Sequence, residues 1–455
     1  MNKILLVMMA VSSTVWSAPD ELARENAHTA GKTVVIPGKG LCEVALDRAN
    51  ATYKCGESAE FTVTIYEKDK TLAKTGKYYY QIDNYGAHVF EKKDVDLEIV
   101  GNPFKVKGTL EYPGFLRLEV KSGKNTLRHY SAAYEPERIT TAEPKPDDFD
   151  KFWDGAVKRL QKKVPLDAKV KKVETSRQDV EISRVSFATF GGKRVYGVLA
   201  LPKQVKGKLP VDLNCPGAGP GYNVKSLANQ ARKDRITLWM SIHDFEVGMG
   251  DAETKARYEE QEKRYRALDA ISKARAYPVA GLSLSREQGH YFNRIVGINR
   301  AFDWAAALPN ADRANIYYHG ASQGGGMGLI LTGLNKSIRR AYMGVPAMCD
   351  LLSCKHDGRQ SGWPRITEYE PKEPADHLAR VQENCRYFDA AYFCDRIRVP
   401  VRLSVGYADE SCAPHSVLAA YNRIPAKDKK LYHGIGGVHS SRNAPMDEVN
   451  AFLGL

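Results

Sequence analysis

The sequence contains no C-x-x-C pair and, beyond its N-terminal segment, no apolar run of about 18 residues. The first absence argues against a zinc site, because structural zinc sites usually use closely spaced cysteine and histidine ligands. The second predicts a soluble mature protein without stable membrane insertion. The glycine-rich stretch LNCPGAGPGY lacks both G-x-G-x-x-G spacing and a Walker lysine. We therefore expect neither a metal nor another cofactor.

Acidic residues are too few to balance the basic ones, and the formal net charge is +13. Such a charge can attract an acidic partner, for example a polyanionic glycan or a nucleic acid. The basic residues are scattered along the chain, however, and they do not alternate with aromatic residues as in nucleic-acid-binding segments. This pattern favours a solvated surface and predicts no nucleic-acid partner.

The chain opens with MNKILLVMMAVSSTVWSAPDE, in which a lysine precedes a short apolar run and small residues surround Ser17 and Ala18. The run is too short to span a bilayer, and this order of segments is typical of a cleaved secretory signal. We therefore expect residues 1–17 to be a signal peptide and the mature protein to be secreted or periplasmic.

Cysteine is even in number in a chain that is expected to be exported, so disulfides are permitted. The residues closest in sequence predict a bond between Cys42 and Cys55 and a pairing within the group from 349 to 394. The eight positions are Cys42, Cys55, Cys215, Cys349, Cys354, Cys385, Cys394 and Cys412.

Two regions differ in the period of their apolar residues. From about residue 42 to residue 134 the period is two, which predicts short antiparallel strands in a sandwich occupying residues 18–140. Gly123, in KSGKN, is a candidate for the positive φ of a hairpin turn. The expected strands include EFTVTIYE, KYYYQIDN, VDLEIV, FKVKGTL and GFLRLEVKSG.

Prolines in the segment 134–154 resist regular structure and predict a linker. After it, Asp147 is expected to cap a helix whose apolar residues from Phe149 to Leu160 share one face. Buried strands then alternate with helices, which predicts an α/β domain over 141–455 with a mostly parallel sheet covered on both faces. The expected strands are VYGVLALP, LPVDLNC, NIYYHG and VPVRLSVG.

The stretch GASQG places Ser322 in a G-x-S-x-G motif, directly after a predicted strand and before an apolar helix. In this context a serine stands on a sharp strand-to-helix turn with its Oγ exposed. A serine hydroxyl is a weak nucleophile until a neighbouring base removes its proton. The motif therefore predicts a hydrolase nucleophile and requires an acid and a histidine further along the chain.

Both residues follow in the expected order of serine, acid and histidine. Asp409 lies a few residues after the strand VPVRLSVG, and His439 lies on a glycine loop after a short C-terminal strand. Glu410 is the alternative acid, and His433, within the strand, is the alternative base. His319 and His415 are expected to be structural.

An oxyanion needs two N–H donors. One is expected to be the backbone N–H of Gln323, directly after the nucleophile, and the other that of Ala218 or Gly219 in the glycine-rich loop. The charged insertion between Tyr222 and His290 follows this loop, and either a cover over the site or a solvated helix would account for it.

The region from about 145 to 455 resembles the acetyl xylan esterase and cephalosporin C deacetylase family, carbohydrate esterase family 7. The likeness rests on GASQGGG, GYADESCAPHSVLAAYNRI, GGVHSS and INRAFDWAAALPNADRANI. It implies an α/β-hydrolase fold, a triad at Ser322, Asp409 and His439, and oxyanion donors at Gln323 and Ala218. The preceding sandwich resembles the immunoglobulin-like domain of some secreted members.

The chain departs from the family at the oxyanion loop, where Pro216-Gly217-Ala218 replaces the usual His-Gly-Tyr, and the Arg-Gly-Gln motif is absent from the insertion. The resemblance predicts a secreted serine esterase that removes acetyl groups from xylan or other acetylated carbohydrates through an acyl-enzyme. A peptidase or a broader acyl-ester hydrolase would share the motif. A catalytically silent glycan-binding protein is the alternative of a different class. The family often forms rings, so a homo-oligomer is possible on this resemblance.

Overall fold

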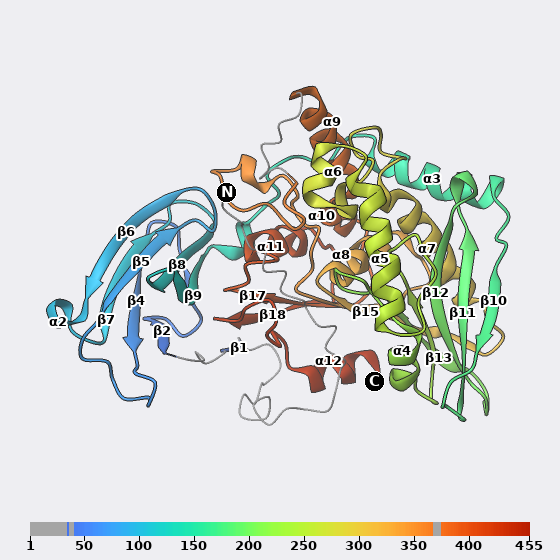
Figure 1. The fold of residues 1–455 in the computed structure, drawn as a ribbon, viewed down its shortest axis with the longest axis horizontal. Helices are drawn as coiled ribbons and strands as arrows, with labels where there is room; N and C mark the ends of the chain where they lie inside the picture. The colour runs from blue at the N-terminus through green and yellow to red at the C-terminus, as the bar shows by residue number, and fades with distance from the viewer. Residues whose placement is uncertain (1–33, 36–40, 367–374) are drawn as a thin grey trace.

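The computed structural model describes residues 34–35, 41–366 and 375–455 (Figure 1). The expected signal peptide, 1–17, lies outside these residues. The described chain forms three sheets: two smaller ones built from residues 42–134, and one of ten strands built from β1 (Val34–Val35) and residues 169–435. Figure 1 shows the two smaller sheets, in blue to teal, beside one end of the larger body.

The N-terminal sandwich consists of a three-stranded sheet, in the order β2-β4-β7, and a five-stranded sheet, in the order β3-β9-β8-β5-β6. Burial alternates along β4, as the period of two predicts. The two sheets face each other, since a Cβ placed at Gly108 of β7 would meet Leu116 of β8 and Ile82 of β5. The strands are β2 (Cys42–Leu46), β3 (Thr52–Tyr53), β4 (Ser58–Ile65), β5 (Lys77–Asp83), β6 (Val89–Asp96), β7 (Phe104–Thr109), β8 (Gly114–Ser122) and β9 (Asn125–Tyr134).

Two local expectations in the sandwich have different outcomes. Gly123 does adopt a positive φ, of 55°, in the turn between β8 and β9. The expected strand VDLEIV is wrong in its second half, because β6 ends at Asp96 and one helical turn, α2 (Leu97–Val100), follows. The carboxylate of Asp96 accepts a hydrogen bond from the N–H of Glu98 at 3.1 Å and so begins this turn.

The linker contains one short helix, η1 (Pro136–Arg138), and then runs without regular structure to α3. It is nevertheless attached to the body. The side chain of Asn422 donates hydrogen bonds to the carbonyls of Pro136 and Ile139, each at 2.9 Å. The N–H of Ala142 donates to the carboxylate of Asp350 at 2.9 Å. The linker therefore fastens the sandwich to the body.

The large sheet has the order β1-β18-β17-β16-β15-β13-β14-β12-β11-β10. Strands from β1 to β14 pair in parallel, whereas β12, β11 and β10 are antiparallel. All four expected buried strands are present, and their pairing confirms a mostly parallel sheet, although VYGVLALP, which forms β12, is antiparallel to both of its neighbours. The strands are β1 (Val34–Val35), β10 (Lys169–Val173), β11 (Val180–Ala188), β12 (Arg194–Pro202), β13 (Leu209–Asn214), β14 (Ile236–Met240), β15 (Ala311–Ala321), β16 (Arg340–Gly344), β17 (Val401–Gly406) and β18 (Lys429–Ile435).

Helices cover this sheet, and α8 packs against both β15 and β16. The predicted capping residue of α3, Asp147, is wrong by one position. The cap is Asp148, which has a φ of −90°, and the helix begins at Phe149. The helices are α3 (Phe149–Lys163), α4 (Val224–Gln230), α5 (Asp251–Arg266), α6 (Ala270–Arg275), α7 (His290–Ala306), α8 (Gln323–Leu334), α9 (Ala375–Cys385), α10 (Ala390–Cys394), α11 (Pro414–Asn422) and α12 (Met446–Leu453). The short helices are η2 (Phe190–Gly192), η3 (Tyr277–Val279), η4 (Ser353–Lys355) and η5 (Arg386–Phe388).

The expected disulfides are wrong, because no cysteine of the described residues forms one. Cys42 is buried on β2, while the Cys55 thiol donates to the Glu135 carboxylate at 3.2 Å. In the group from 349 to 394, the Cys349 thiol contacts the Ala347 carbonyl at 3.4 Å and that of Cys394 the Ala390 carbonyl at 3.4 Å. The thiols of Cys55, Cys349 and Cys394 therefore contact an oxygen instead of a second sulfur. Among the described helices, none is both long enough and apolar enough to cross a membrane.

Candidate active site

The predicted nucleophile stands on a sharp turn between β15 and α8. Ser322 has φ 56° and ψ −122°, a conformation that a non-glycine residue adopts only when its surroundings enforce it. Its carbonyl accepts hydrogen bonds from the N–H groups of Gly326 and Ala347, each at 2.9 Å. A Cβ at Gly320 would lie 2.7 Å from the carbonyl oxygen of Gly324. The glycines of the motif therefore allow the turn to close on itself.

The structure brings the three predicted residues into one hydrogen-bonded row. Nε2 of His439 lies 3.0 Å from Oγ of Ser322. Nδ1 of the same ring lies 2.9 Å from Oδ2 of Asp409. Ser322 and Asp409 are 117 and 30 residues from His439 in sequence, so only the parallel order of β15, β17 and β18 unites them. This geometry permits proton transfer from the serine to the imidazole.

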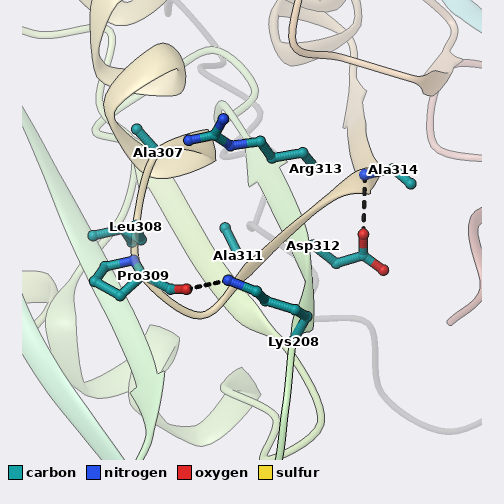
Figure 2. Close-up of a pocket in the computed structure, with 8 residues that line it drawn as sticks. All are labelled: Lys208, Ala307, Leu308, Pro309, Ala311, Asp312, Arg313 and Ala314. Atoms are coloured by element: carbon teal, nitrogen blue, oxygen red, sulfur yellow. Dashed lines mark hydrogen bonds between the residues drawn. The ribbon is translucent and has the colours of Figure 1, made fainter.

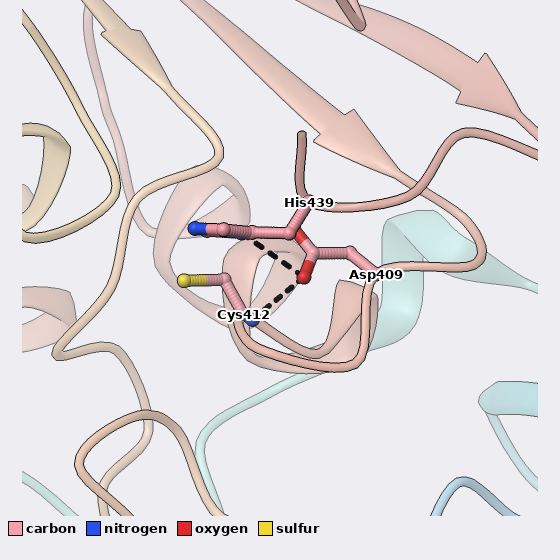
Figure 3. Close-up of side chains that lie close together, drawn as sticks. All are labelled: Asp409, Cys412 and His439. Atoms are coloured by element: carbon pink, nitrogen blue, oxygen red, sulfur yellow. Dashed lines mark hydrogen bonds and ion pairs between the residues drawn. The ribbon is translucent and has the colours of Figure 1, made fainter. Parts of the chain in front are cut away.

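Asp409 is fully buried and held on several sides (Figure 3). Its Oδ1 accepts the N–H groups of Ser411 and Cys412, each at 2.8 Å, and its own N–H donates to the Gly406 carbonyl at 3.2 Å. These bonds fix the carboxylate with one face turned toward His439. The loop after β17 thus presents a rigid acceptor to the imidazole.

Opposing effects act on the His439 imidazole. Burial disfavours its charged form, whereas hydrogen bonds to the Asp409 carboxylate and to the Cys412 thiol favour it, and together they raise the pKa of His439 above its usual value. Burial in turn raises the pKa of the Cys412 thiol, which keeps its proton. The site is therefore suited to stabilise an imidazolium once a proton has arrived.

The alternative residues occupy other positions. Glu410 points away from the row, and Oε1 of its carboxylate lies 3.2 Å from Nδ1 of His129 in the sandwich. His433 contacts the hydroxyl of Tyr407 at 2.9 Å, and burial lowers its pKa to about 4. His415 donates through Nε2 to the Gln360 carbonyl at 2.7 Å. His319 lies 3.0 Å from Asp212. Each of these side chains has a partner outside the row.

The predicted oxyanion donors lie beside the serine. Gln323 is the first residue of α8, so its N–H has no partner carbonyl within the helix. The glycine-rich loop passes close to this helix start, since a Cβ at Gly324 would lie 2.3 Å from the Cys215 carbonyl. Gly219 has φ 110°, a value that favours glycine. The loop that carries Ala218 therefore runs past the nucleophile.

Sequence reasoning missed the groups that hold these donors in place. Nε2 of His243, just after β14, donates to the Gly219 carbonyl at 2.8 Å, and its Nδ1 accepts from the Gln261 amide at 3.0 Å. Burial lowers the pKa of His243 to about 4, so the ring is neutral. The Gln323 side chain is held by the hydroxyls of Tyr277, at 2.9 Å, and Tyr291. The signal for this role in the sequence is the position of His243, three residues after the buried strand β14.

These contacts also decide between the two interpretations of the insertion. Gln261 belongs to α5 and Tyr277 to η3. The insertion therefore holds His243 and the Gln323 side chain, which lie on the oxyanion side of the site. It is also interrupted by β14, which pairs between β13 and β12 in the large sheet. The segment 222–290 is therefore neither a separate cover nor a purely solvated helix.

The sandwich contacts the loop that carries the acid. The loop between β5 and β6 inserts Tyr85, whose hydroxyl donates to the Tyr407 carbonyl at 3.1 Å, two residues before Asp409. Phe115 of β8 packs edge-on against the Tyr407 ring, with 4.9 Å between centroids. Tyr85, Phe115 and Tyr407 are all buried. Part of the acid loop's packing therefore comes from outside the α/β body.

A second contact between the two regions is ionic. Nε2 of His129 lies 2.9 Å from Glu119, and Nδ1 lies 3.2 Å from Glu410, the residue after the acid. Burial works against a charged ring, but the two carboxylates outweigh it and raise the pKa of His129. On the body's side the Gln360 amide donates to the Glu410 carbonyl at 2.8 Å. The residue next to Asp409 is thus held from both regions.

A surface hollow of about 560 Å³ lies elsewhere (Figure 2). It is lined by Lys208, which precedes β13, and by Ala307–Pro309 and Ala311–Ala314, where β15 begins. Because β13 and β15 are parallel, this end of the sheet is opposite the end at which Ser322 follows β15. The hollow is therefore separate from the row of Ser322, His439 and Asp409.

The mostly parallel sheet, the serine on a strand-to-helix elbow and the later acid and histidine loops define the α/β-hydrolase class. Solved structures agree with this fold. An acetyl xylan esterase from Paenibacillus sp. R4 superposes with a TM-score of 0.57 at 22% identity, covering 70% of this chain and 98% of that one. Acetyl xylan esterase 1 from Thermoanaerobacterium sp. JW/SL YS485 gives 0.55 at 20% identity, covering 70% and 96%.

The chain belongs to the acetyl xylan esterase family (AXE1), whose model matches residues 134–446. Acetyl esterase Axe7A of Xylanibacter ruminicola is 28% identical over 330 residues, which make up 71% of this chain and 70% of that protein. The protein is therefore a carboxylic ester hydrolase with acetyl xylan esterase activity. The expected family and fold class, an α/β-hydrolase preceded by a β region, are confirmed.

Proposed function

We propose that the protein is an exported serine esterase that releases acetate from acetylated xylan or other acetylated carbohydrates. The observation that carries the mechanism is the position of His439, which contacts Ser322 through one nitrogen and Asp409 through the other. The family match supports an acetylated carbohydrate as the substrate. Export is supported by the sequence of residues 1–17.

In the first step Oγ of Ser322 attacks the acetyl carbonyl while Nε2 of His439 takes the hydroxyl proton. Asp409 holds the ring with Nδ1–H toward itself and stabilises the imidazolium that forms. The negative charge on the carbonyl oxygen is stabilised by the N–H groups of Gln323 and Ala218. His439 then gives its proton to the departing sugar oxygen, which leaves as a hydroxyl group.

The second step uses the same groups with water in place of the sugar. The water gives a proton to His439 and attacks the acetyl-serine, and a second tetrahedral oxyanion forms at the same donors. Its collapse breaks the bond to Oγ, releases acetate and returns the proton to Ser322. The cycle consumes one water and needs no further reactant.

The test compares wild type, Ser322→Ala and Ser411→Ala on acetylated xylo-oligosaccharides and on a chromogenic acetate ester. Ser411 contacts Asp409 through its backbone N–H, so its substitution is a matched control. We expect Ser322→Ala to lower kcat by roughly 10⁴- to 10⁶-fold with an unchanged melting temperature. Retained turnover in this variant would refute the mechanism. Cleavage of the small ester alone would instead favour a broader acyl-ester hydrolase.

A further inference from the structure

The site contains a thiol that the proposed mechanism does not use. Cys412 is 2% exposed, and its thiol neighbours both His439 and Ser322. One ligand atom each from Asp409, Cys412 and His439 lie within 4.8 Å of one another. Figure 3 shows the thiol beside the imidazole ring, below the end of the ring that lies farther from the Asp409 carboxylate. The fold alone creates this cluster, since its members come from two separate loops.

The three donor types together select a particular kind of cation. Thiolate sulfur and imidazole nitrogen favour thiophilic ions such as Zn²⁺, whereas Mg²⁺ and Ca²⁺ favour sites made only of oxygen. In a tetrahedral zinc site, neighbouring ligand atoms lie roughly 3.4–3.6 Å apart. Drawing the three atoms together therefore requires side-chain movements of about 1 Å, which rotation of the Cys412 side chain can supply.

We propose that Asp409, Cys412 and His439 form an inhibitory binding site for a thiophilic divalent cation. On binding, the Cys412 thiol releases its proton to solvent and the sulfur coordinates as thiolate. The charges of thiolate and carboxylate balance those of the ion. The ion coordinates one imidazole nitrogen of His439, and coordination at either nitrogen prevents His439 from acting as the general base. Coordination at Nδ1 breaks the hydrogen bond to Asp409, and coordination at Nε2 occupies the lone pair that would accept the Ser322 proton.

The inhibition rests on the proposed roles of Ser322 and His439, whereas the binding does not. Two measurements therefore distinguish a failure of the proposed cation site from a failure of the proposed esterase mechanism. The first is hydrolysis of a chromogenic acetate ester by the chelator-treated full-length protein with increasing Zn²⁺, with Mg²⁺ as the control ion. The second is the absorption of the Co²⁺-loaded protein without substrate, where thiolate coordination produces a charge-transfer band in the near ultraviolet.

We expect Zn²⁺ but not Mg²⁺ to inhibit the wild type. In Cys412→Ser the half-inhibitory Zn²⁺ concentration, measured against that variant's own uninhibited rate, should rise at least tenfold. Cys55→Ser, which alters a thiol bonded to Glu135 in the sandwich, should behave like wild type. The Co²⁺ band should appear in wild type and in Ser322→Ala and be lost in Cys412→Ser.

Equal Zn²⁺ inhibition of wild type and Cys412→Ser would overturn the proposal. So would the absence of a thiolate band in Co²⁺-loaded wild type, a result that does not depend on whether Cys412→Ser folds. An inactive wild type that still shows the band would retain the binding site and refute the esterase mechanism instead.

Discussion

The two sides of the active site are supported by different regions of the molecule. On the oxyanion side, His243 and Tyr277 belong to the α/β body and hold the Gly219 carbonyl and the Gln323 side chain. On the acid side, Tyr85 and His129 come from the sandwich and contact Tyr407 and Glu410, the neighbours of Asp409. The sandwich is therefore part of the environment of the proposed acid, whereas the contacts of the proposed oxyanion donors named above come from the body.

This difference predicts that damage to the two regions has separable effects. Loosening the body's support should reduce stabilisation of the oxyanion, a charge that exists only in the transition state. Loosening the sandwich's support should instead change the position of the acid and the protonation of His439. The substitutions below test this separation, beginning with the largest expected effect.

Asp409→Asn tests the acid itself. The asparagine leaves the imidazole in the wrong tautomer, and we expect kcat to fall by about 10⁴-fold. Asp409 raises the pKa of His439, so removing its charge should lower that pKa. Because the base must be neutral, the acidic limb of kcat/KM should move to lower pH. Its pH profile against wild type measures both effects.

Glu410→Gln is the matched control for this substitution. Its carboxylate contacts His129 and lies outside the catalytic row, so we expect kcat to stay within about threefold, as for most polar surface changes. A larger fall in kcat for Glu410→Gln than for Asp409→Asn would identify Glu410 as the acid.

His243→Phe tests the support of the oxyanion side. It removes the N–H that holds the Gly219 carbonyl, and we expect kcat to fall roughly 10- to 100-fold, less than the 10²- to 10³-fold typical of losing a donor itself. KM should change little. His243→Gln keeps an N–H donor and should recover part of kcat. Equal kcat in His243→Phe and wild type would show that the loop needs no such support.

Tyr85→Ala tests the sandwich's support of the acid side. Truncation of a buried aromatic residue costs about 3–5 kcal/mol of unfolding free energy. We expect a similar cost in Phe61→Ala, because Phe61 is fully buried on β4 within the sandwich. Only Tyr85→Ala should also lower kcat, by roughly tenfold, about 1.4 kcal/mol of transition-state stabilisation. Denaturant unfolding and kinetics well below the melting temperature separate the two effects, and equal kcat in both variants would reduce Tyr85 to a packing role.

His129→Gln should have the smallest effect, on the order of 1 kcal/mol of stability. The pKa of His129 is raised in the folded protein, so its charged form stabilises the fold fully below the unfolded pKa. That contribution disappears as the pH rises through the folded pKa. The difference in melting temperature between wild type and His129→Gln should therefore be greatest in mildly acidic buffer. A melting-temperature difference that increases with pH would contradict the conclusion that His129 is charged in the folded protein.

The sequence alone predicted five strands of the body, β12, β13, β15, β17 and β18, and it singled out Ser322, Asp409 and His439. These features depend on local patterns, namely buried strands, glycines around a serine and loops that directly follow strands. The turn at Leu97–Val100 was missed because LEIV has the residue types of a strand, and the capping carboxylate of Asp96 decided otherwise.

Other features arise only from packing. His243 and Gln261 are 18 residues apart and meet through the placement of α5. Tyr85 and Tyr407 are 322 residues apart and meet because the sandwich rests on the body. No local pattern marks such pairs. The disulfide prediction failed for the same reason, since closeness in sequence does not decide where a buried thiol points.

The family match begins at residue 134, the last residue of β9 in the sandwich. The Tyr134 ring is fully buried, and its hydroxyl donates to the carbonyls of Glu57 and Gly108. The stretch that the family model matches therefore excludes Tyr85 and Phe115, the sandwich residues that contact Tyr407. A truncated protein that began at residue 134 would lack Phe115 and Tyr85. The Tyr407 ring would then lose its edge-on contact with Phe115, and the Tyr407 carbonyl would lose its hydrogen bond from Tyr85.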